Sequence, residues 1–300
     1  MATRNRKNSV NVGLVQMRCS DDPEENLQNA FDGASEAASN GADVICLQEL
    51  FRSRYFCQSE DESHFALAEP VPGPSTERFA ELARTHDVAM VISLFEERAP
   101  GLYHNTTAVL DGARGYVGKY RKMHIPDDPR YYEKYYFTPG DLGFRTFETA
   151  KADLGVLICW DQWYPEAARL TAMQGADMLF YPTAIGWHAE ENPAVKADQH
   201  DAWRTIQRAH AIANGCFVVS VNRTGFEPDP SGNGGIEFWG QSFVAAPDGS
   251  ILCSAPADEE CVLVQSLDLG AIARQRHGWP FFRDRRIDAY GAITERFLKS

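Results

Sequence analysis

The chain has 300 residues, of which 44% are hydrophobic and 24% are charged, and its formal net charge is −13. This composition is typical of a globular protein, and a chain of this length can bury a sizeable core without disulfide bonds. The negative charge repels phosphate backbones, so binding to nucleic acid is disfavoured and cationic ligands are weakly favoured.

The cysteines and the N-terminus indicate where the protein works. Seven cysteines, an odd number without a CxxC spacing, are typical of free thiols in a reducing compartment. The opening residues MATRNRKNSV lack the apolar stretch of a signal peptide, and no apolar run approaches the length that spans a bilayer. We therefore expect a cytoplasmic protein without membrane contact, with a flexible segment at residues 1–8 and one domain at residues 9–300.

Short β-branched runs recur along the chain and predict strands, several of them buried on both faces. They cover residues 10–17, 43–47, 89–95, 106–110, 154–158, 178–181, 217–221, 242–246 and 262–267. Hairpin-like segments at 104–121 and 242–267 predict that the sheet structure is partly antiparallel.

Helical patterns alternate with these strands. Asp22 can cap a helix that starts at Pro23 and ends at residues 40–41. Further helices are predicted from about 165 to 175 and from about 197 to 214, the latter closed by Gly215. The last helix is expected to present one small and apolar face, made of Ala202, Ile206, Ala209 and Ala213. Interleaved strands and helices predict the α/β class.

The segment LGVLICWDQWYPEAARL places Cys159 directly after an apolar strand and before a helix that opens near Pro165. A side chain at such an elbow projects into the crevice at the carboxyl end of the strand. Backbone N–H groups of the turn favour a thiolate and could hold an oxyanion. A buried cysteine that acts as a small hydrophobe is the alternative, and the local pattern alone does not decide between the two.

Two further segments carry candidate charged groups. Glu49 closes the apolar strand 43–47, where a carboxylate is costly unless it is paired or used; a hydrogen-bonded structural glutamate is the alternative. Lys122 lies in GKYRKMHIP, which could be an exposed basic face. Because the apolar Met123 and Ile125 interrupt that face, one of the lysines could point inward toward an acid.

Taken together, these segments resemble the nitrilase superfamily of carbon–nitrogen hydrolases. The family's Glu, Lys and Cys motifs appear as DVICLQELF, KYRKMHIP and ICWDQWYPEAAR, and a second family glutamate resembles Glu133 in YYEKYYFTPGDLGF. The resemblance covers nearly the whole chain and implies a four-layer α–β–β–α sandwich and a homodimer or larger homo-oligomer. The C-terminal tail at 279–300, both aromatic and charged, would suit a subunit interface or could pack on its own domain.

The resemblance also implies a mechanism. Glu49 would act as general base, Cys159 as the nucleophile that forms a thioester, and Lys122 with the Trp160 backbone N–H as oxyanion donors. Glu133 would hold Lys122 charged and in place. The mechanism needs no cofactor and no metal, and the sequence contains no metal-ligand spacing such as HExxH.

Within the superfamily, stretches such as CWDQWYPEAARL and FYPTAIG resemble the N-carbamoylputrescine amidases, which release putrescine, ammonia and carbon dioxide from a ureido group. This resemblance implies a small cationic carbamoyl-amine substrate and a pocket whose aromatic lining includes Tyr55, Tyr131 and Trp163.

One departure leaves the substrate open. The subfamily pattern PTAIGSEP has a glutamate suited to the distal ammonium, whereas PTAIGWHAEENP places His188 there. Glu190 or Glu191 could replace that glutamate, the loop could simply be solvated, or the substrate could differ. A β-ureidopropionase-like enzyme and an ω-amide hydrolase are alternatives, and an inactive interaction scaffold is a remote one.

Overall fold

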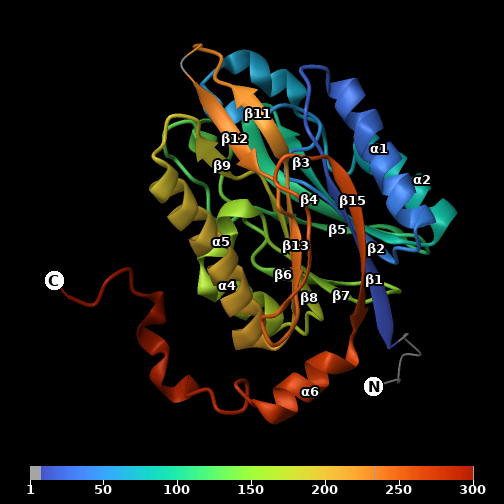
Figure 1. Cartoon of the computed structure of the whole chain (residues 1–300), viewed down its shortest axis with the longest axis vertical. Coiled ribbons are helices and arrows are strands. Elements are labelled where there is room, and N and C mark those ends of the chain that lie inside the picture. Colours follow the sequence, from blue (N-terminus) through green and yellow to red (C-terminus); the bar gives the residue numbers. More distant parts are fainter. Residues whose placement is uncertain (1–7, 233, 300) are drawn as a thin grey trace.

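The computed structural model describes residues 8–232 and 234–299, and within these ranges two six-stranded sheets lie face to face (Figure 1). Residues 1–7, which make up most of the predicted flexible segment, lie outside the described residues. Helices cover the outer faces of both sheets, so the chain is layered α–β–β–α. The predicted α/β class and the four-layer sandwich are therefore confirmed.

The first sheet is mixed and is covered by two helices, α1 (Pro23–Ser39) and α2 (Pro74–His86). Its strands, in spatial order, are β15 (Cys261–Asp268), β1 (Ser9–Gln16), β2 (Val44–Leu47), β3 (Ala89–Ala99), β4 (Leu102–Asp111) and β5 (Gly115–Arg121). The pairs β1–β2 and β2–β3 are parallel, and the other pairs are antiparallel.

The second sheet is covered by α4 (Pro165–Ala172) and α5 (Pro193–Asn214), on the side of the molecule opposite α1 and α2 (Figure 1). Its strands, in spatial order, are β14 (Ile251–Ser254), β13 (Phe243–Ala245), β10 (Phe217–Asn222), β8 (Met178–Thr183), β7 (Asp153–Val156) and β6 (Arg145–Glu148).

The remaining elements are short. A three-stranded sheet in the described part of the chain contains β11 (Thr224–Pro228), β12 (Gly235–Trp239) and β9 (Gly186–His188). Two short helices are α3 (Glu133–Tyr136) and α6 (Gly270–Gly278), and 3₁₀ turns are η1 (Phe56–Gln58), η2 (Glu62–Leu67), η3 (Cys159–Trp163), η4 (Ile287–Ala289) and η5 (Gly291–Thr294). After α6 the chain runs along the edge of the molecule to the C-terminus (Figure 1).

Strand β1 shows how the period of the sequence produces the layers. Val12 and Leu14 point into the core shared by the two sheets, whereas Val15 belongs to the core under α1 and α2. Gly13 faces α1, and a Cβ there would lie 2.9 Å from the Cβ of Ala37, so the glycine permits this close approach. Because successive side chains of β1 enter two different cores, both faces of the strand are buried, and the strand is an almost continuous apolar run.

Helix α1 begins as the sequence predicts, because the Asp22 side chain accepts the backbone N–H groups of Glu24 and Glu25. Helix α5 begins earlier than predicted, because the Asn192 side chain caps it by accepting the N–H of Ala194.

The predicted apolar face of α5 is not its buried face. The buried side chains are Trp203, Gln207, His210, Ala211 and Asn214. Polar groups can occupy this interface because they are hydrogen-bonded: Gln207 Nε2 donates to Ser220 Oγ over 3.3 Å, and a ring nitrogen of His210 lies 2.7 Å from the Gln162 carbonyl oxygen.

The segment 242–267 is only partly the predicted hairpin. Strands β13 and β14 do pair antiparallel in the second sheet. Strand β15, however, leaves that sheet and pairs antiparallel with β1 in the first. A run of apolar residues predicts a strand but does not identify its partner.

Candidate active site

Three chain segments that follow strands bring Glu49, Lys122 and Cys159 into one buried site. Glu49 lies two residues after β2, Lys122 directly follows β5, and Cys159 begins the turn η3 after β7. The exposed fractions of these residues are 0%, 0% and 5%. Because β2 packs against β8, the neighbour of β7 in the second sheet, the ends of both sheets contribute to the same site.

Lys122 binds two carboxylates. Its Nζ lies 2.8 Å from Glu49 Oε1, and 2.9 and 2.7 Å from the two carboxylate oxygens of Glu133. Burial alone would lower the pKa of Lys122, but the charges of Glu133 and Glu49 outweigh burial and raise this pKa well above its usual value. Lys122 is therefore an ammonium at neutral pH.

One oxygen of Glu49 is bound and the other is free. Oε1 accepts the Lys122 ammonium and also the side-chain amide of Asn105, over 2.7 Å. Oε2 is buried and has no hydrogen-bond partner among the described residues. The backbone beside it is fixed by Arg223, whose Nη2 donates to the carbonyl oxygens of Glu49 and Leu50 over 2.8 and 3.1 Å. The free oxygen is thus a fixed acceptor for a proton.

Cys159 sits on a strained turn and is held as a thiol. Its φ is +39°, which is uncommon for a residue other than glycine, and its Sγ lies 3.9 Å from the carbonyl oxygen of Ala184. Burial raises the pKa of the thiol well above its usual value; Glu49 raises it further, and Lys122 only partly offsets this. The turn was predicted to favour a thiolate, but burial outweighs that effect at Cys159, so the thiol needs a base.

The turn that carries the thiol is braced by a buried aspartate. Asp161 Oδ2 accepts the backbone N–H of Ile158 over 3.0 Å and the hydroxyl of Tyr120 over 2.8 Å. Its Oδ1 accepts the backbone N–H of His124 over 3.1 Å, and the Nδ1 of the same residue lies 2.7 Å away. These contacts tie the Cys159 elbow to the segment that follows Lys122.

Tyr55 acts on this site through a carboxylate. Its hydroxyl donates to Glu133 Oε1 over 2.7 Å, and its side chain is buried behind Glu133, outside the lining of the pocket. Burial raises the pKa of Glu133 even though Lys122 opposes this, so the Tyr55 hydrogen bond helps to keep that carboxylate ionised. The sequence predicted that Tyr55 contacts the substrate, whereas in the structure Tyr55 does not line the pocket and contacts Glu133, which does.

A pocket of about 340 Å³ leads from the surface to the thiol. It is lined by Pro126, Asp128, Tyr131, Glu133, Cys159, Trp160, Trp163, Ala184, Ile185, Gly186, His188, Glu191, Gln199, Ala202 and Trp239. Four residues that the sequence predicted at the substrate, Tyr131, Trp160, Trp163 and His188, line this pocket. Glu190 is not among the lining residues, because its side chain is 58% exposed and pairs with Arg130 over 2.7 Å.

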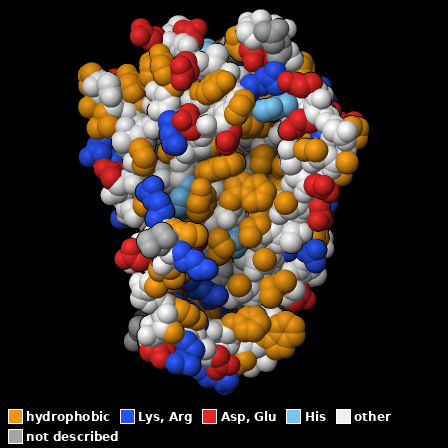
Figure 2. All heavy atoms as spheres, turned by 90° about the vertical axis from the view of Figure 1, so that its left-hand side faces the viewer, with side chains coloured by type: hydrophobic (Ala, Val, Ile, Leu, Met, Phe, Trp, Pro, Cys, Tyr) orange, Lys and Arg blue, Asp and Glu red, His pale blue; other side chains and the backbone are white. Residues whose placement is uncertain are grey.

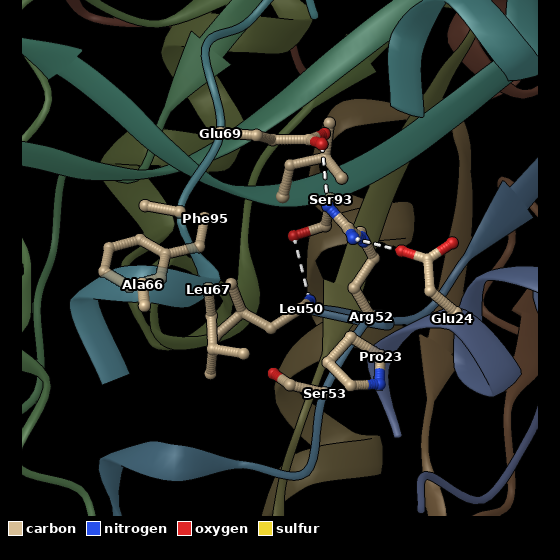
Figure 3. A pocket seen from close by; sticks show the side chains of 12 residues that line it. Pro23, Glu24, Leu50, Arg52, Ser53, Ala66, Leu67, Glu69, Ser93 and Phe95 are labelled. Carbon is tan, nitrogen blue, oxygen red and sulfur yellow. Dashed lines mark hydrogen bonds and ion pairs between the residues drawn. The ribbon is translucent and has the colours of Figure 1, made fainter. Parts of the chain in front are cut away.

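A second cavity, of about 260 Å³, lies beside the turn that follows β2 (Figure 3). Arg52 bridges Glu24 and Glu69 there over 3.1 and 2.7 Å, and Ser93 Oγ accepts the N–H of Leu50 over 3.3 Å. Its described lining residues include no cysteine, lysine or histidine. The contacts of Arg52 and Ser93 hold this turn in place, and neither serine of the lining, Ser53 or Ser93, has a histidine or lysine beside it in the lining that could act as its base.

Sequence reasoning missed Asn105 and the role of Arg223. Asn105 lies within β4 and is buried, but its neighbours in the sequence, His104 and Thr106, are also polar, so no local signal distinguishes it. Arg223 is fully buried, and its Nη1 donates to Glu227 over 2.7 Å. A buried arginine requires several acceptors, but the sequence does not reveal that two of them are the carbonyls of Glu49 and Leu50.

The described residues offer no metal site, and the thiols are free. Among the described residues, no three His, Cys, Asp or Glu side chains are grouped so that they could hold a metal ion. None of the helices in the described ranges is long and apolar enough to cross a membrane. The seven cysteines are all free thiols.

Comparison with known proteins identifies the family. Residues 11–277 match the family model "Carbon-nitrogen hydrolase". The chain belongs to the carbon–nitrogen hydrolase family. It is therefore an enzyme that hydrolyses non-peptide carbon–nitrogen bonds, and the predicted resemblance to this superfamily is confirmed.

Individual family members are similar over nearly their full length. The chain is 45% identical to an N-carbamoylputrescine amidase of Solanum lycopersicum, over 98% of this chain and 97% of that protein. It is 36% identical to a citrullinase of Francisella tularensis, over 96% and 99%. A crystal structure of a carbon–nitrogen hydrolase from Helicobacter pylori G27 matches with a TM-score of 0.93 and 44% identity, over 97% of this chain and 100% of that chain.

Proposed function

We propose that this carbon–nitrogen hydrolase cleaves the ureido group of N-carbamoylputrescine and releases putrescine, ammonia and carbon dioxide. The observation that carries the proposal is the pocket, which joins the Cys159 thiol to the carboxylates of Glu191 and Asp128 nearer the surface. A substrate that has a carbonyl at one end and an ammonium at the other matches both ends. The Solanum lycopersicum relative, named for this activity, supports the same substrate.

The proposed reaction begins with a proton transfer. The free Oε2 of Glu49 takes the thiol proton of Cys159, and the thiolate attacks the ureido carbonyl carbon. The carbonyl oxygen becomes an oxyanion, which accepts hydrogen bonds from the Lys122 ammonium and the Trp160 backbone N–H. In this assignment Glu133 keeps Lys122 charged and aimed at that oxygen.

The reaction then proceeds through a covalent intermediate. Glu49, now protonated, gives its proton to the leaving nitrogen, and the carbonyl carbon remains bonded to Sγ of Cys159 as a thioester. Glu49 next takes a proton from water, whose oxygen attacks the carbonyl carbon of the thioester. The bond between this carbon and Sγ then breaks, and Glu49 returns the proton to the departing thiolate. The carbamic acid formed in this step loses carbon dioxide. No metal or cofactor takes part in any of these steps.

The assay that tests the proposal measures ammonia release from four substrates: N-carbamoylputrescine, N-carbamoyl-β-alanine, L-citrulline and a simple ω-amide. We expect kcat/KM to be highest for the first. A higher value for the second or the last would replace the proposed substrate by that of a β-ureidopropionase-like or ω-amide hydrolase. Cys159→Ala is the control and should lose turnover while its thermal unfolding stays cooperative.

The proposal extends to organisation and compartment. We propose that residues 9–300 form one domain, since both sheets contribute to one core, and that the protein acts in the cytoplasm, where seven free thiols persist. We also propose a homodimer or larger homo-oligomer with the tail 279–300 at the interface.

Exposed apolar side chains support the interface. In the tail, Trp279 is 59% exposed and Phe297 is 78% exposed. Apolar side chains also gather across the face of the molecule that carries α5 (Figure 2). Light scattering of the full chain should give a multiple of the monomer mass, and Trp279→Ser combined with Phe297→Ser should shift it toward the monomer. A full-length chain that is monomeric would refute the oligomer.

A further inference from the structure

The pocket changes in character from its floor to its mouth. Cys159 and Glu133 at the floor are 5% and 0% exposed, whereas His188 and Glu191 are half-buried and Asp128 is exposed. The walls between them are mainly aromatic and apolar. A substrate whose carbonyl reaches Cys159 therefore extends an aliphatic segment along these walls and places its far end beside the carboxylates.

Glu191 is held in a fixed orientation by two neutral donors. Its Oε2 accepts the backbone N–H of His188 over 3.0 Å, and its Oε1 accepts the Gln199 side-chain amide over 2.9 Å. No lysine or arginine in the described part of the chain forms a salt bridge with it. Each carboxylate oxygen can accept about two hydrogen bonds, so each retains capacity for another donor.

Two neighbouring acidic residues, Glu190 and Asp128, are less suited than Glu191 to bind an ammonium inside the pocket. Glu190 is neutralised by Arg130 and lies outside the pocket. Asp128 lines the pocket, but at its exposed rim, where water screens its charge. Glu191 alone among these three combines partial burial, a place in the pocket and fixed orientation by neutral donors.

We propose that Glu191 binds the distal ammonium of the substrate and thereby selects cationic ureides over neutral and anionic ones. This inference rests on the proposed function and deepens it, because it assigns the specificity to one carboxylate. The geometry set by Gln199 and His188 means that little ordering is required when the ammonium arrives. Trp163 and Trp239, which line the same pocket, pack against the substrate's methylene groups and favour a nearby cation.

The test compares two substrates that differ only at the far end. N-carbamoylputrescine carries an ammonium there, and N-pentylurea carries a methyl group of similar size. For the wild type we expect a clear preference in kcat/KM for the cationic substrate. In Glu191→Gln the kcat/KM for N-carbamoylputrescine should fall roughly 10- to 100-fold, mainly through KM, the range expected for losing a charge-assisted hydrogen bond. The value for N-pentylurea should stay within about twofold.

Two further measurements separate recognition from loop structure. Glu190→Gln changes the neighbouring residue on the same loop and breaks only its ion pair with Arg130, so it should alter both substrates by the same factor or neither. N-carbamoyl-β-alanine carries a carboxylate at its far end, so its kcat/KM should rise in Glu191→Gln, where the repulsion is gone.

The outcomes distinguish this inference from the proposed function. A wild type that prefers the cationic ureide, together with a Glu191→Gln variant that keeps the full preference, would overturn the role of Glu191 and leave the proposed substrate intact. An equal loss for both substrates in Glu191→Gln would assign Glu191 to loop structure only and overturn the inference. A wild type without any preference for the ammonium would overturn the inference and the proposed substrate together.

Discussion

Replacing Lys122 with methionine tests whether one buried ammonium holds two buried carboxylates together. Methionine matches the side chain in length but carries no charge. In the variant, Glu49 would retain Asn105 and Glu133 would retain Tyr55, but both would lose a contact of 2.9 Å or shorter to a cation. Two carboxylates would then share a site that is 0% exposed without a positive charge.

The expected loss of stability is large because breaking a buried ion pair leaves uncompensated charge. Such changes cost about 3–5 kcal/mol. With an unfolding entropy of roughly 2.1 cal/mol/K per residue, a chain of 300 residues would lose about 5–8 °C in Tm. Burial raises the pKa of Glu133 and Lys122 opposes this, so the pKa should rise further in Lys122→Met, and the deficit in stability should be larger at pH 8 than at pH 5.

The double variant Lys122→Met with Glu133→Gln separates charge balance from catalysis. It removes one carboxylate together with the ammonium and should recover at least about half of the lost Tm. Activity should not recover, because an oxyanion donor worth about 10²–10³ in kcat is still missing. Scanning calorimetry and ammonia release measure the two effects. An unchanged Tm in Lys122→Met would show that the Lys122 ammonium does not stabilise the two buried carboxylates. A double variant with wild-type activity would show that Lys122 does not donate to the oxyanion.

Three other changes have separate expected outcomes. Tyr55→Phe removes a hydrogen bond to Glu133 and should lower kcat about 10-fold with little change in KM; a rise in KM alone would instead place Tyr55 at the substrate. Asp22→Ala removes the cap of α1 and should cost about 1 kcal/mol in denaturant unfolding at unchanged kcat. Although burial raises it, the pKa of Glu96 is lowered from 4.5 to about 2 by Arg121 and its other partners. The stability that Glu96 contributes is therefore present above pH 4.5 and is lost as pH falls toward 2, so Glu96→Gln should destabilise the protein at pH 7 but hardly at pH 2.5.

The fold could be predicted where the sequence carries a strong local signal. Apolar runs locate the central strands of both sheets, and Asp22 followed by Pro23 locates the start of α1. Pairing was harder to predict, since β15 reads as a neighbour of β14 along the chain but joins the other sheet beside β1. The buried face of α5 was predicted wrongly, because polar residues such as Gln207 and His210 are expected to face solvent. In the structure both are buried and have hydrogen-bond partners.

The site could be predicted in its parts but not in its electrostatics. The elbow at Cys159 and the strand-end position of Glu49 follow from the chain pattern. The protonated resting state of the thiol does not, because it depends on how far burial outweighs Lys122. For the distal amine the sequence predicted Glu190, with Glu191 as the other possibility. The structure separates them, because Glu190 is exposed and paired with Arg130, whereas Glu191 lines the pocket.

In the proposed mechanism, Sγ of Cys159 becomes bonded to the substrate carbonyl carbon during turnover. The most direct measurement is acid quenching of the enzyme during steady-state turnover of N-carbamoylputrescine, followed by intact-mass and peptide mass spectrometry. We expect a carbamoyl or N-alkylcarbamoyl group on the peptide that contains Cys159, and no adduct in Cys159→Ala. Turnover by Cys159→Ala at the wild-type rate, or an adduct on another cysteine, would contradict the account.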